Sequence, residues 1–340
     1  MIKAVIVDDV ATVREILKIA LESDPEIKVV GMARGGKQAI DIIPVLKPDI
    51  VLMDLKMPDM DGFQTVRHIM DYFPVPIVII SSVSAKRDDM MFQVLECGAL
   101  DFIPKPSLGD FDTNPNFAKD LVQKIKIFAA ANISKKIKVK FGTSKILNLS
   151  GIGKNKKKVV AIASSTGGPG ALKEIIPLFP PDLPAGIVIV QHIVEGFVAG
   201  LVDWLQKLSR IKIKVANEGD VVAPGIVFFS PDTSHIIIDE NGKIKFEKSP
   251  PVGGVRPAAD ILFPSVAKYY GSSAIGVIMT GMGDDGARGI ERIKKEGGVT
   301  IAQNEETCTV FGMPKAAVER GVIDKIVPLN MIPETIIKLL

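Results

Sequence analysis

The chain of 340 residues is 47% hydrophobic and 24% charged, and its formal net charge at pH 7 is +3. This length exceeds that of a usual single domain, so we expect two domains. Cys97 and Cys308 are too few for a disulfide framework and are typical of a reducing compartment. No apolar run reaches the roughly 18 residues of a membrane-spanning helix. We therefore expect a cytoplasmic protein that does not insert into a membrane.

The first domain is predicted over residues 1–130, where short apolar runs alternate with helical patterns. Continuous apolar strands separated by helices predict a parallel sheet covered on both faces, which is a doubly wound α/β domain. The expected strands are Ile2–Val7, Val29–Gly31, Ile50–Met53, Ile77–Ile80 and Leu100–Ile103. The expected helices include Val13–Leu21, Gly62–Met70 and Phe117–Ala131.

Residues 131–157 are predicted to be a lysine-rich linker. Nine lysines and no acidic residue fall between residues 132 and 158, so the rest of the chain has a net charge of −6. The stretch contains Gly142, Gly151 and Gly153 and has weak periodicity, which favours a solvated tether. Phe141 is its one aromatic residue, so we do not expect it to bind nucleic acid.

A second alternation of strands and helices, over residues 158–340, predicts another doubly wound parallel sheet. The expected strands are Val159–Ala163, Ile187–Val190, Val227–Phe229, Ala274–Thr280 and Val299–Ala302. The expected helices are Ala171–Leu178, Val198–Leu208, Ala258–Tyr269, Ala287–Glu296 and Pro314–Arg320. In such sheets, chemistry gathers at the carboxyl ends of the strands.

Acidic residues follow two strands of the first domain. Asp8 and Asp9 come after the first strand, and Asp54 ends a central strand. Carboxylates held together repel one another unless a cation lies among them, and this set suits Mg²⁺. Asp54 is then a candidate nucleophile toward a phosphoryl group. Lys105 is a candidate to pair with Asp54, and the Ser81 hydroxyl is a candidate to form a hydrogen bond with a phosphoryl oxygen.

The second domain offers a candidate hydrolase site. Ser165 lies between a predicted strand and a predicted helix, and His192 and Asp285 each follow another strand. These residue types suit a nucleophile, its general base and an acid that orients the base. Backbone N–H groups near Thr166 and Met282 are candidates for an oxyanion hole. Their spacing does not establish that the three side chains converge.

Each part of this site also has a structural interpretation. A Ser-Thr-Gly-Gly turn is commonly a helix cap. The segment 281–286 is a GxGxxG pattern between a strand and a helix, as in dinucleotide-binding folds. However, Asp284 and Asp285 would oppose a pyrophosphate in that loop. His68 and His235, the two other histidines, are interpreted as structural.

The first domain resembles the response-regulator receiver domains, and this resemblance implies a flavodoxin-like fold. It is carried by Asp8-Asp9, by Met53-Asp54-Leu55-Lys56-Met57-Pro58-Asp59-Met60-Asp61-Gly62, by Ser81-Ser82 and by Phe102-Ile103-Pro104-Lys105-Pro106. It implies that Asp54 is the phosphoacceptor. Asp9, Asp54 and the Lys56 carbonyl would ligate Mg²⁺ with Asp8 assisting, and Ser81 and Phe102 would respond to the phosphoryl group.

The second domain resembles the catalytic domain of the chemotaxis protein-glutamate methylesterases, which implies a Rossmann-like three-layer fold. The matching segments are Ile162–Pro169, Val190–His192, Pro231-Asp232 with His235, Arg256-Pro257 with Asp260, Met279–Ala287 and Phe311–Pro314. The resemblance implies that Ser165 is the nucleophile, His192 the base and Asp285 the orienting acid, with Thr166 and Met282 in the oxyanion hole. Ser164 departs from the usual Ala or Gly, and Ala258-Ala259 replaces Ser-Val.

Together these features predict a phosphorylation-activated enzyme that hydrolyses glutamate methyl esters, and deamidates glutamines, on the cytoplasmic helices of chemoreceptors. The resemblance implies a chemotaxis histidine kinase as phosphodonor, Mg²⁺ in the receiver domain and no cofactor for the esterase reaction. We do not expect a nucleic-acid partner. The alternative is a receiver domain fused to a non-catalytic, protein-binding output domain.

Overall fold

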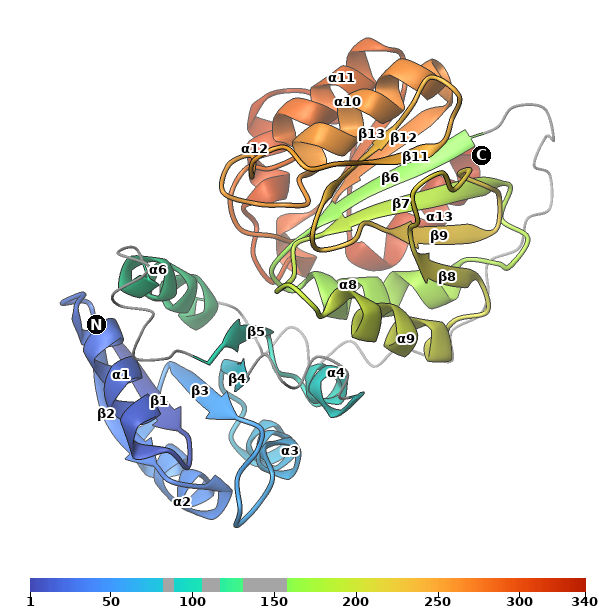
Figure 1. Ribbon diagram of the computed structural model, residues 1–340. Helices are drawn as coiled ribbons and strands as arrows, with labels where there is room; N and C mark the ends of the chain where they lie inside the picture. The colour runs from blue at the N-terminus through green and yellow to red at the C-terminus, as the bar shows by residue number, and fades with distance from the viewer. Residues whose placement is uncertain (82–88, 106–116, 131–157) are drawn as a thin grey trace. The chain divides into compact units, whose positions relative to one another are not determined.

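The computed structural model describes residues 1–81, 89–105, 117–130 and 158–340, with backbone only at 81, 89–91 and 104 (Figure 1). The chain divides into two compact units between residues 140 and 141. The expected linker lies outside the described residues, so the predicted domain bounds stay a prediction. In the described part of the chain, no helix is both long and apolar enough to cross a bilayer.

The first unit contains one parallel sheet with the strand order β2-β1-β3-β4-β5. Its strands are β1 (Ile2–Val7), β2 (Ile27–Ala33), β3 (Ile50–Asp54), β4 (Ile77–Ser81) and β5 (Asp101–Pro104). Its described helices are α1 (Ala11–Glu22), α2 (Gly36–Leu46), α3 (Gly62–Tyr72), α4 (Asp89–Glu96) and α6 (Phe117–Ala129). The doubly wound architecture is confirmed.

Alternate residues of each central strand enter different cores, because successive side chains of a strand point to opposite faces. In β1, Ala4 and Ile6 pack with α1 and α6, whereas Val5 and Val7 pack with α2, α3 and α4. All four residues are at most 1% exposed. From Ala4 to Val7 the strand is therefore continuously apolar rather than alternating.

The second unit is built on a parallel sheet with the strand order β14-β13-β12-β6-β7-β9-β8. Its strands are β6 (Lys158–Ser164), β7 (Ala185–Gln191), β8 (Lys212–Val215), β9 (Ile226–Phe229), β12 (Ala274–Ile278), β13 (Val299–Gln303) and β14 (Lys325–Val327). An antiparallel pair, β10 (His235–Ile238) and β11 (Ile244–Glu247), lies outside this sheet.

Helices cover both faces of the second sheet. Figure 1 shows α10 and α11 on one face and α8 and α9 on the other. The helices are α8 (Gly168–Ile175), α9 (Val198–Leu208), α10 (Ala259–Tyr270), α11 (Ala287–Lys295), α12 (Met313–Glu319) and α13 (Ile332–Leu339), with short 3₁₀ turns at 176–178, 271–273, 305–307 and 329–331. Val159, Ala161 and Ala163 of β6 pack against the α10–α12 side, and Val160 and Ile162 are fully buried on the other.

The order of strands creates a switch point in each sheet. In the first sheet, β2 lies on one side of β1 and β3 lies on the other. In the second sheet, β7 lies on one side of β6 and β12 lies on the other. The crevice at the carboxyl ends of strands beside such a switch point is the usual ligand site of these folds. Asp8, Asp54, Ser165 and His192 all lie at these ends.

Most expected elements are present with bounds shifted by one or two residues. The expected strand Ala274–Thr280 ends at Ile278, and the expected helix Ala171–Leu178 is α8 followed by a 3₁₀ turn. We did not predict β8, β11 or β14, which are three or four residues long and each contain lysine. Short edge strands carry too little apolar pattern to be recognised locally.

Candidate functional sites

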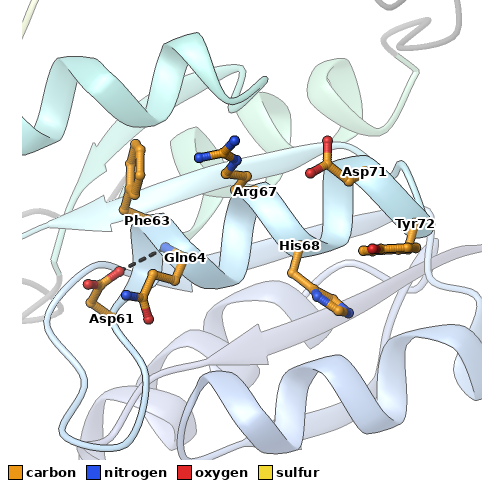
Figure 2. Close-up of a pocket in the computed structure, with 7 residues that line it drawn as sticks. All are labelled: Asp61, Phe63, Gln64, Arg67, His68, Asp71 and Tyr72. Atoms are coloured by element: carbon orange, nitrogen blue, oxygen red, sulfur yellow. Dashed lines mark hydrogen bonds between the residues drawn. The ribbon is translucent and has the colours of Figure 1, made fainter.

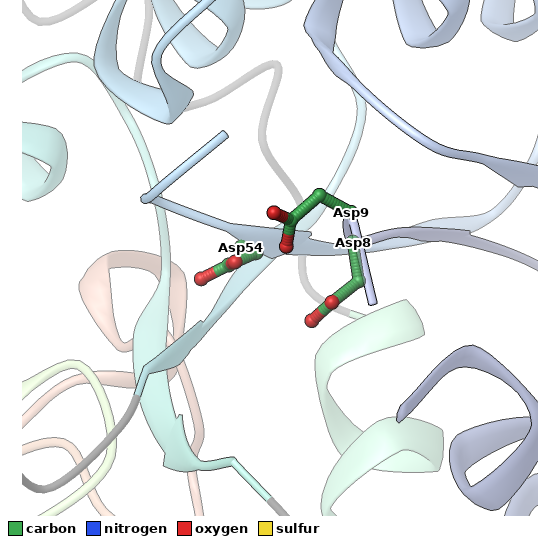
Figure 3. A group of neighbouring side chains, drawn as sticks. All are labelled: Asp8, Asp9 and Asp54. Atoms are coloured by element: carbon green, nitrogen blue, oxygen red, sulfur yellow. The ribbon is translucent and has the colours of Figure 1, made fainter. Parts of the chain in front are cut away.

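The acidic residues of the first unit meet at the carboxyl ends of β1 and β3 (Figure 3). One carboxylate oxygen from each of Asp8, Asp9 and Asp54 lies within 4.8 Å of the other two. Asp8 and Asp54 are buried, at 1% and 4% exposure, and Asp9 is exposed. Three carboxylates at this separation form a site of strong negative potential that faces solvent through Asp9.

Lys105, just beyond β5, partly neutralises this cluster. Its Nζ lies 2.9 Å from Asp8 Oδ2 and 2.8 Å from Asp54 Oδ2. Burial disfavours the lysine charge, but the hydrogen bonds and negative charges of Asp54 and Asp8 outweigh it and raise the pKa of Lys105. The ammonium is therefore held charged beside the proposed phosphoacceptor.

The donor set of this cluster fits a divalent cation. One lysine leaves two of the three negative charges uncompensated. Asp8 Oδ2 is buried, and among the described residues Lys105 Nζ, 2.9 Å away, is its polar partner. Burial, as the largest cause, raises the pKa of Asp8. Hard oxygen ligands of this kind are those that Mg²⁺ prefers.

The loop after β3 shows which residues of its acid-rich motif are structural. Asp59 accepts hydrogen bonds from the N–H groups of Gly36 and Lys37, at 3.1 and 3.2 Å, and so caps α2. Asp61 caps α3 by accepting from Gln64 N at 2.8 Å. A Cβ on Gly62 would lie 2.6 Å from Leu55 Cα, so glycine lets the loop close against the end of β3.

Lys56, Phe102 and Ser81 are the remaining candidate residues of the first unit. Lys56 is exposed two residues after Asp54, and the role of its carbonyl stays a prediction. Phe102 is half-buried and packs edge-to-face on Phe92, with ring centroids 5.7 Å apart. The Ser81 side chain lies outside the described residues, so its role also stays a prediction.

A surface pocket of about 410 Å³ lies along α3 (Figure 2). The rings of His68 and Tyr72 are tilted against each other there, with centroids 4.7 Å apart, and Phe63, Arg67 and Asp71 are among the other residues that line the pocket. Helical spacing alone explains this grouping, because residues three or four apart are neighbours on a helix. The structural role of His68 stays a prediction.

In the second unit, strand register brings Ser165 next to His192. Ser164 of β6 is paired with Gln191 of β7, and each is followed directly by a candidate catalytic residue. The backbone N–H of His192 donates to Ser164 O at 2.9 Å, and that of Ser165 donates to Thr280 O at 3.0 Å. The two residues thus occupy neighbouring positions at one end of the sheet.

His192 and Asp285 form a hydrogen-bonded pair. His192 Nε2 lies 2.8 Å from Asp285 Oδ2. Two backbone N–H groups at the start of α10 also donate to this carboxylate, from Ala259 to Oδ2 at 2.7 Å and from Asp260 to Oδ1 at 3.0 Å. Burial opposes the charge of Asp285, but these hydrogen bonds and the His192 charge outweigh it and lower its pKa. Asp285 is therefore ionised near neutral pH.

The two adjacent serines have different environments. Ser164 is fully buried, and its Oγ donates to Gln191 Oε1 at 2.6 Å. Ser165 is half-buried, and its hydroxyl makes no hydrogen bond within the described residues, including with the His192 ring. The Ser165 hydroxyl is thus the one free to meet a ligand. Since Nε2 of His192 faces Asp285, Nδ1 is the ring atom left for Ser165.

The loops around Ser165 leave backbone donors open. The N–H groups of Thr166 and Met282 make no hydrogen bond within the described ranges, and both residues are half-buried. A Cβ on Gly281 would lie 2.8 Å from Ser165 Cβ, so this glycine allows the loop after β12 to approach the serine. Unpaired N–H groups near a free hydroxyl are what an oxyanion hole requires.

The GxGxxG segment has a local explanation. Gly283 and Gly286 have φ of 85° and 86°, which favours glycine, and Gly286 precedes α11. Asp285, within the segment, binds the amides of α10 and the His192 ring. The loop thus presents a carboxylate where a dinucleotide would place its pyrophosphate, which supports the interpretation as part of the hydrolase site.

Sequence reasoning gave no role to Gln191 and Thr280, which support this site, and it interpreted His235 as structural. His235 is fully buried, and its ring bonds Ala258 N and Pro250 O, both at 3.1 Å, beside the amides that hold Asp285. Gln191 and Thr280 are also buried and bond the turn that carries Ser165. One signal was available, because each is a polar residue at the end of an otherwise apolar run.

A phosphoacceptor-type acid cluster on one α/β unit and a Ser/His/Asp set on another define a response regulator with a hydrolase-like output domain. Two family models match the chain, the response regulator receiver domain over residues 4–111 and the CheB methylesterase over residues 160–336. The chain belongs to the CheB methylesterase family.

Relatives and a solved structure agree with this assignment. A protein of Pyrococcus horikoshii named protein-glutamate methylesterase/protein-glutamine glutaminase is 43% identical, covering 99% of this chain and 93% of its own length. A protein of the same name from Symbiobacterium thermophilum is 40% identical, covering 98% and 96%. The crystal structure of the Thermotoga maritima CheB methylesterase catalytic domain is 44% identical with a TM-score of 0.53, covering 54% of this chain and all of that one.

Proposed function

We propose that this chain hydrolyses glutamate methyl esters on chemoreceptors, deamidates glutamines there through the same intermediate, and is activated by phosphorylation of Asp54. The observation that carries the proposal is the His192–Asp285 pair, with a 2.8 Å hydrogen bond, beside the free hydroxyl of Ser165. The full-length relatives named protein-glutamate methylesterase/protein-glutamine glutaminase support the substrate class and disfavour a non-catalytic output domain.

In the proposed reaction, Ser165 Oγ attacks the ester carbonyl carbon and its proton passes to His192 Nδ1. Asp285 accepts a hydrogen bond from Nε2 and stabilises the imidazolium that forms. The Thr166 and Met282 N–H groups bind the oxyanion. The ester C–O bond then breaks, and methanol leaves with the proton from His192. When the substrate is glutamine, the C–N bond breaks and ammonia leaves with that proton.

The second half of the reaction releases the product. Water gives a proton to His192 and attacks the acyl carbon, and Ser165 leaves and recovers its proton. The product is a glutamic acid side chain, which loses its proton to the solvent and becomes a carboxylate. Each turnover therefore places one negative charge on the receptor where a neutral ester or amide stood.

The receiver site has the groups that phosphorylation needs. Asp8, Asp9 and Asp54, with the Lys56 carbonyl, would hold Mg²⁺, which would neutralise charge on the transferring phosphoryl group. Asp54 would accept the phosphoryl group from a chemotaxis histidine kinase. Lys105 would pair with the acceptor, and Ser81 and Phe102 would respond to the phosphorylated state. The proposed location is the cytoplasm, which these proposed partners and the two free cysteines support.

The test is methanol release from a methylated chemoreceptor, with and without a small-molecule phosphodonor and Mg²⁺. Ser165→Ala should abolish release, whereas Ser209→Ala, which removes a buried hydroxyl at the end of α9, should leave it unchanged. Asp54→Ala should retain basal release and lose the response to the phosphodonor. Retained turnover in Ser165→Ala would refute the nucleophile.

A serine-directed fluorophosphonate separates this proposal from the alternative of a binding module. We expect the Ser165 oxygen of the parent protein to attack the phosphorus of the probe and displace fluoride, which phosphonylates Ser165, and we expect the Ser165→Ala variant to be unreactive. Equal labelling of the two proteins would point to a different nucleophile.

A further inference from the structure

Gln191, the last residue of β7, contacts the backbone of both Ser165, the proposed nucleophile, and His192, the proposed base. It is 3% exposed. Its Nε2 donates to Ser165 O at 2.9 Å and to His192 O at 2.8 Å. One amide nitrogen therefore connects the chain that leaves β6 with the chain that leaves β7.

The partners of Gln191 determine how its amide group is oriented. Two carbonyl acceptors require the NH₂ end, since a carbonyl oxygen has no proton to donate. The other end, Oε1, accepts from Ser164 Oγ at 2.6 Å. Both NH₂ protons and the oxygen are thus used, and a buried amide with every group paired is costly to displace.

Gly168, at the start of α8, makes room for this amide. Its backbone is outside the left-handed region, so it does not need glycine for its φ. A Cβ at this position would nevertheless collide with Oε1 of Gln191. Glycine at position 168 therefore leaves the space that the Gln191 amide occupies.

The serine turn is also held from the side of β12. Thr280 Oγ1 lies 2.9 Å from Thr166 O, and Ser165 N donates to Thr280 O. These contacts fix the turn but do not reach His192. Gln191 supplies the side-chain link between the nucleophile's backbone and the base's backbone.

We propose that Gln191 is a positioning residue that sets the approach of the Ser165 hydroxyl to the His192 ring. This inference rests on the mechanism proposed above. Gln191 contacts backbone carbonyls beneath the site and not the substrate, so its loss should lower kcat and leave KM unchanged. A misplacement of about 1 Å between reacting groups costs roughly 100-fold in rate, so we expect a loss of about 10- to 100-fold.

The main variant is Gln191→Met in the full chain, which keeps the length of the side chain and removes its hydrogen bonds. The matched control is Gln206→Met. Gln206 on α9 makes the same set of hydrogen bonds with its side-chain amide. Its Nε2 donates to Ser209 O and Ile211 O at 3.2 and 3.3 Å, and its Oε1 accepts from Ile213 N at 2.8 Å. It lies near edge strand β8, away from the site. We expect its kcat for methanol release to stay within about 3-fold of the parent.

Gly168→Ala perturbs the same amide without changing Gln191. It should also lower kcat by about 10-fold or more while KM stays within about 3-fold. In the unmodified protein, the side-chain NH₂ protons of Gln191 should exchange slowly with water in ¹⁵N-resolved spectra, because both are bonded and buried. Rapid exchange of these protons would overturn the proposal even if neither variant folds.

Other results are equally decisive. Three results would each overturn the role of Gln191. The first is a kcat within 3-fold of the parent in folded Gln191→Met, and the second is an equal loss of kcat in Gln206→Met. The third is a rise in KM in Gln191→Met in place of a fall in kcat. Ser165→Ala distinguishes this failure from failure of the proposed mechanism. If Ser165→Ala is inactive and Gln191→Met is fully active, the mechanism stands and only the positioning role is lost.

Discussion

Replacing Asp285 by asparagine separates its charge from its hydrogen bonds. Asp285 Oδ2 accepts from both His192 and Ala259, whereas Oδ1 accepts from Asp260 alone among the described residues. The asparagine oxygen should take the Oδ2 position, because the opposite orientation would place an NH₂ group against two donors. The His192 tautomer would then be kept, and the negative charge beside the ring would be lost.

The charge effect can be estimated from the geometry. Two unit charges about 4 Å apart at an effective dielectric constant of about 20 interact by about 4 kcal/mol. Loss of this stabilisation from the imidazolium in the transition state corresponds to a fall of roughly 1000-fold in kcat. Asp285→Ala should be at least 10-fold slower still, because it also frees the His192 tautomer and leaves two buried N–H groups without an acceptor.

The assay is the initial rate of methanol release over a range of methylated-receptor concentrations, with thermal unfolding measured on each variant. Asp284→Asn is the matched control, since Asp284 is the exposed neighbouring acid, and it should match the parent. A loss of less than 10-fold in Asp285→Asn would refute the electrostatic argument. Equal rates for Asp285→Asn and Asp285→Ala would refute the argument about tautomers.

Three further predictions test other parts of the molecule. Ser164→Ala should retain at least one tenth of the parent's kcat but lower the free energy of unfolding by about 1–3 kcal/mol, measured by denaturant titration, because Gln191 Oε1 loses its donor. Mg²⁺ should raise the unfolding temperature of the parent and raise it less in Asp8→Asn, whose cluster has one charge fewer; equal shifts would contradict the proposed cation site. Because folding lowers the pKa of Asp285, the ionised carboxylate stabilises the folded protein above the ordinary pKa of 3.8, and this stabilisation is lost as the pH falls through the lower pKa of the folded state. The difference in unfolding temperature between the parent and Asp285→Asn should therefore shrink below about pH 4, and a difference that grows there would contradict the argument.

The apolar pattern predicted the central strands of both sheets because burial on two faces leaves a local trace. Each residue of β1 or β6 must be apolar wherever it enters a core, and such a run can be recognised without its neighbours. The helices between the runs then required parallel strands. Edge strand β14 was missed because one face of a three-residue strand leaves no comparable pattern.

The candidate residues were recognised because Ser165 and His192 directly follow apolar strands, because Asp285 lies in the loop after another, and because their motifs resemble a known family. The roles of neighbouring acids were less visible. Asp59 and Asp61 stand in the same motif as Asp54, yet they cap helices, and only their hydrogen bonds distinguish them from the phosphoacceptor candidate.

The sequence by itself determined two doubly wound domains and the residue types of two sites, since both follow from local burial and local chemistry. The tertiary structure decided which of these residues meet. The pairing of Ser164 with Gln191 and the return of β12 beside β6 bring together groups that are 27 to 120 residues apart in the chain. Strand register and sheet order arise from packing the whole chain, and no single segment carries them. The same packing buries the Ser164 hydroxyl against Gln191 and leaves the Ser165 hydroxyl without a hydrogen bond among the described residues.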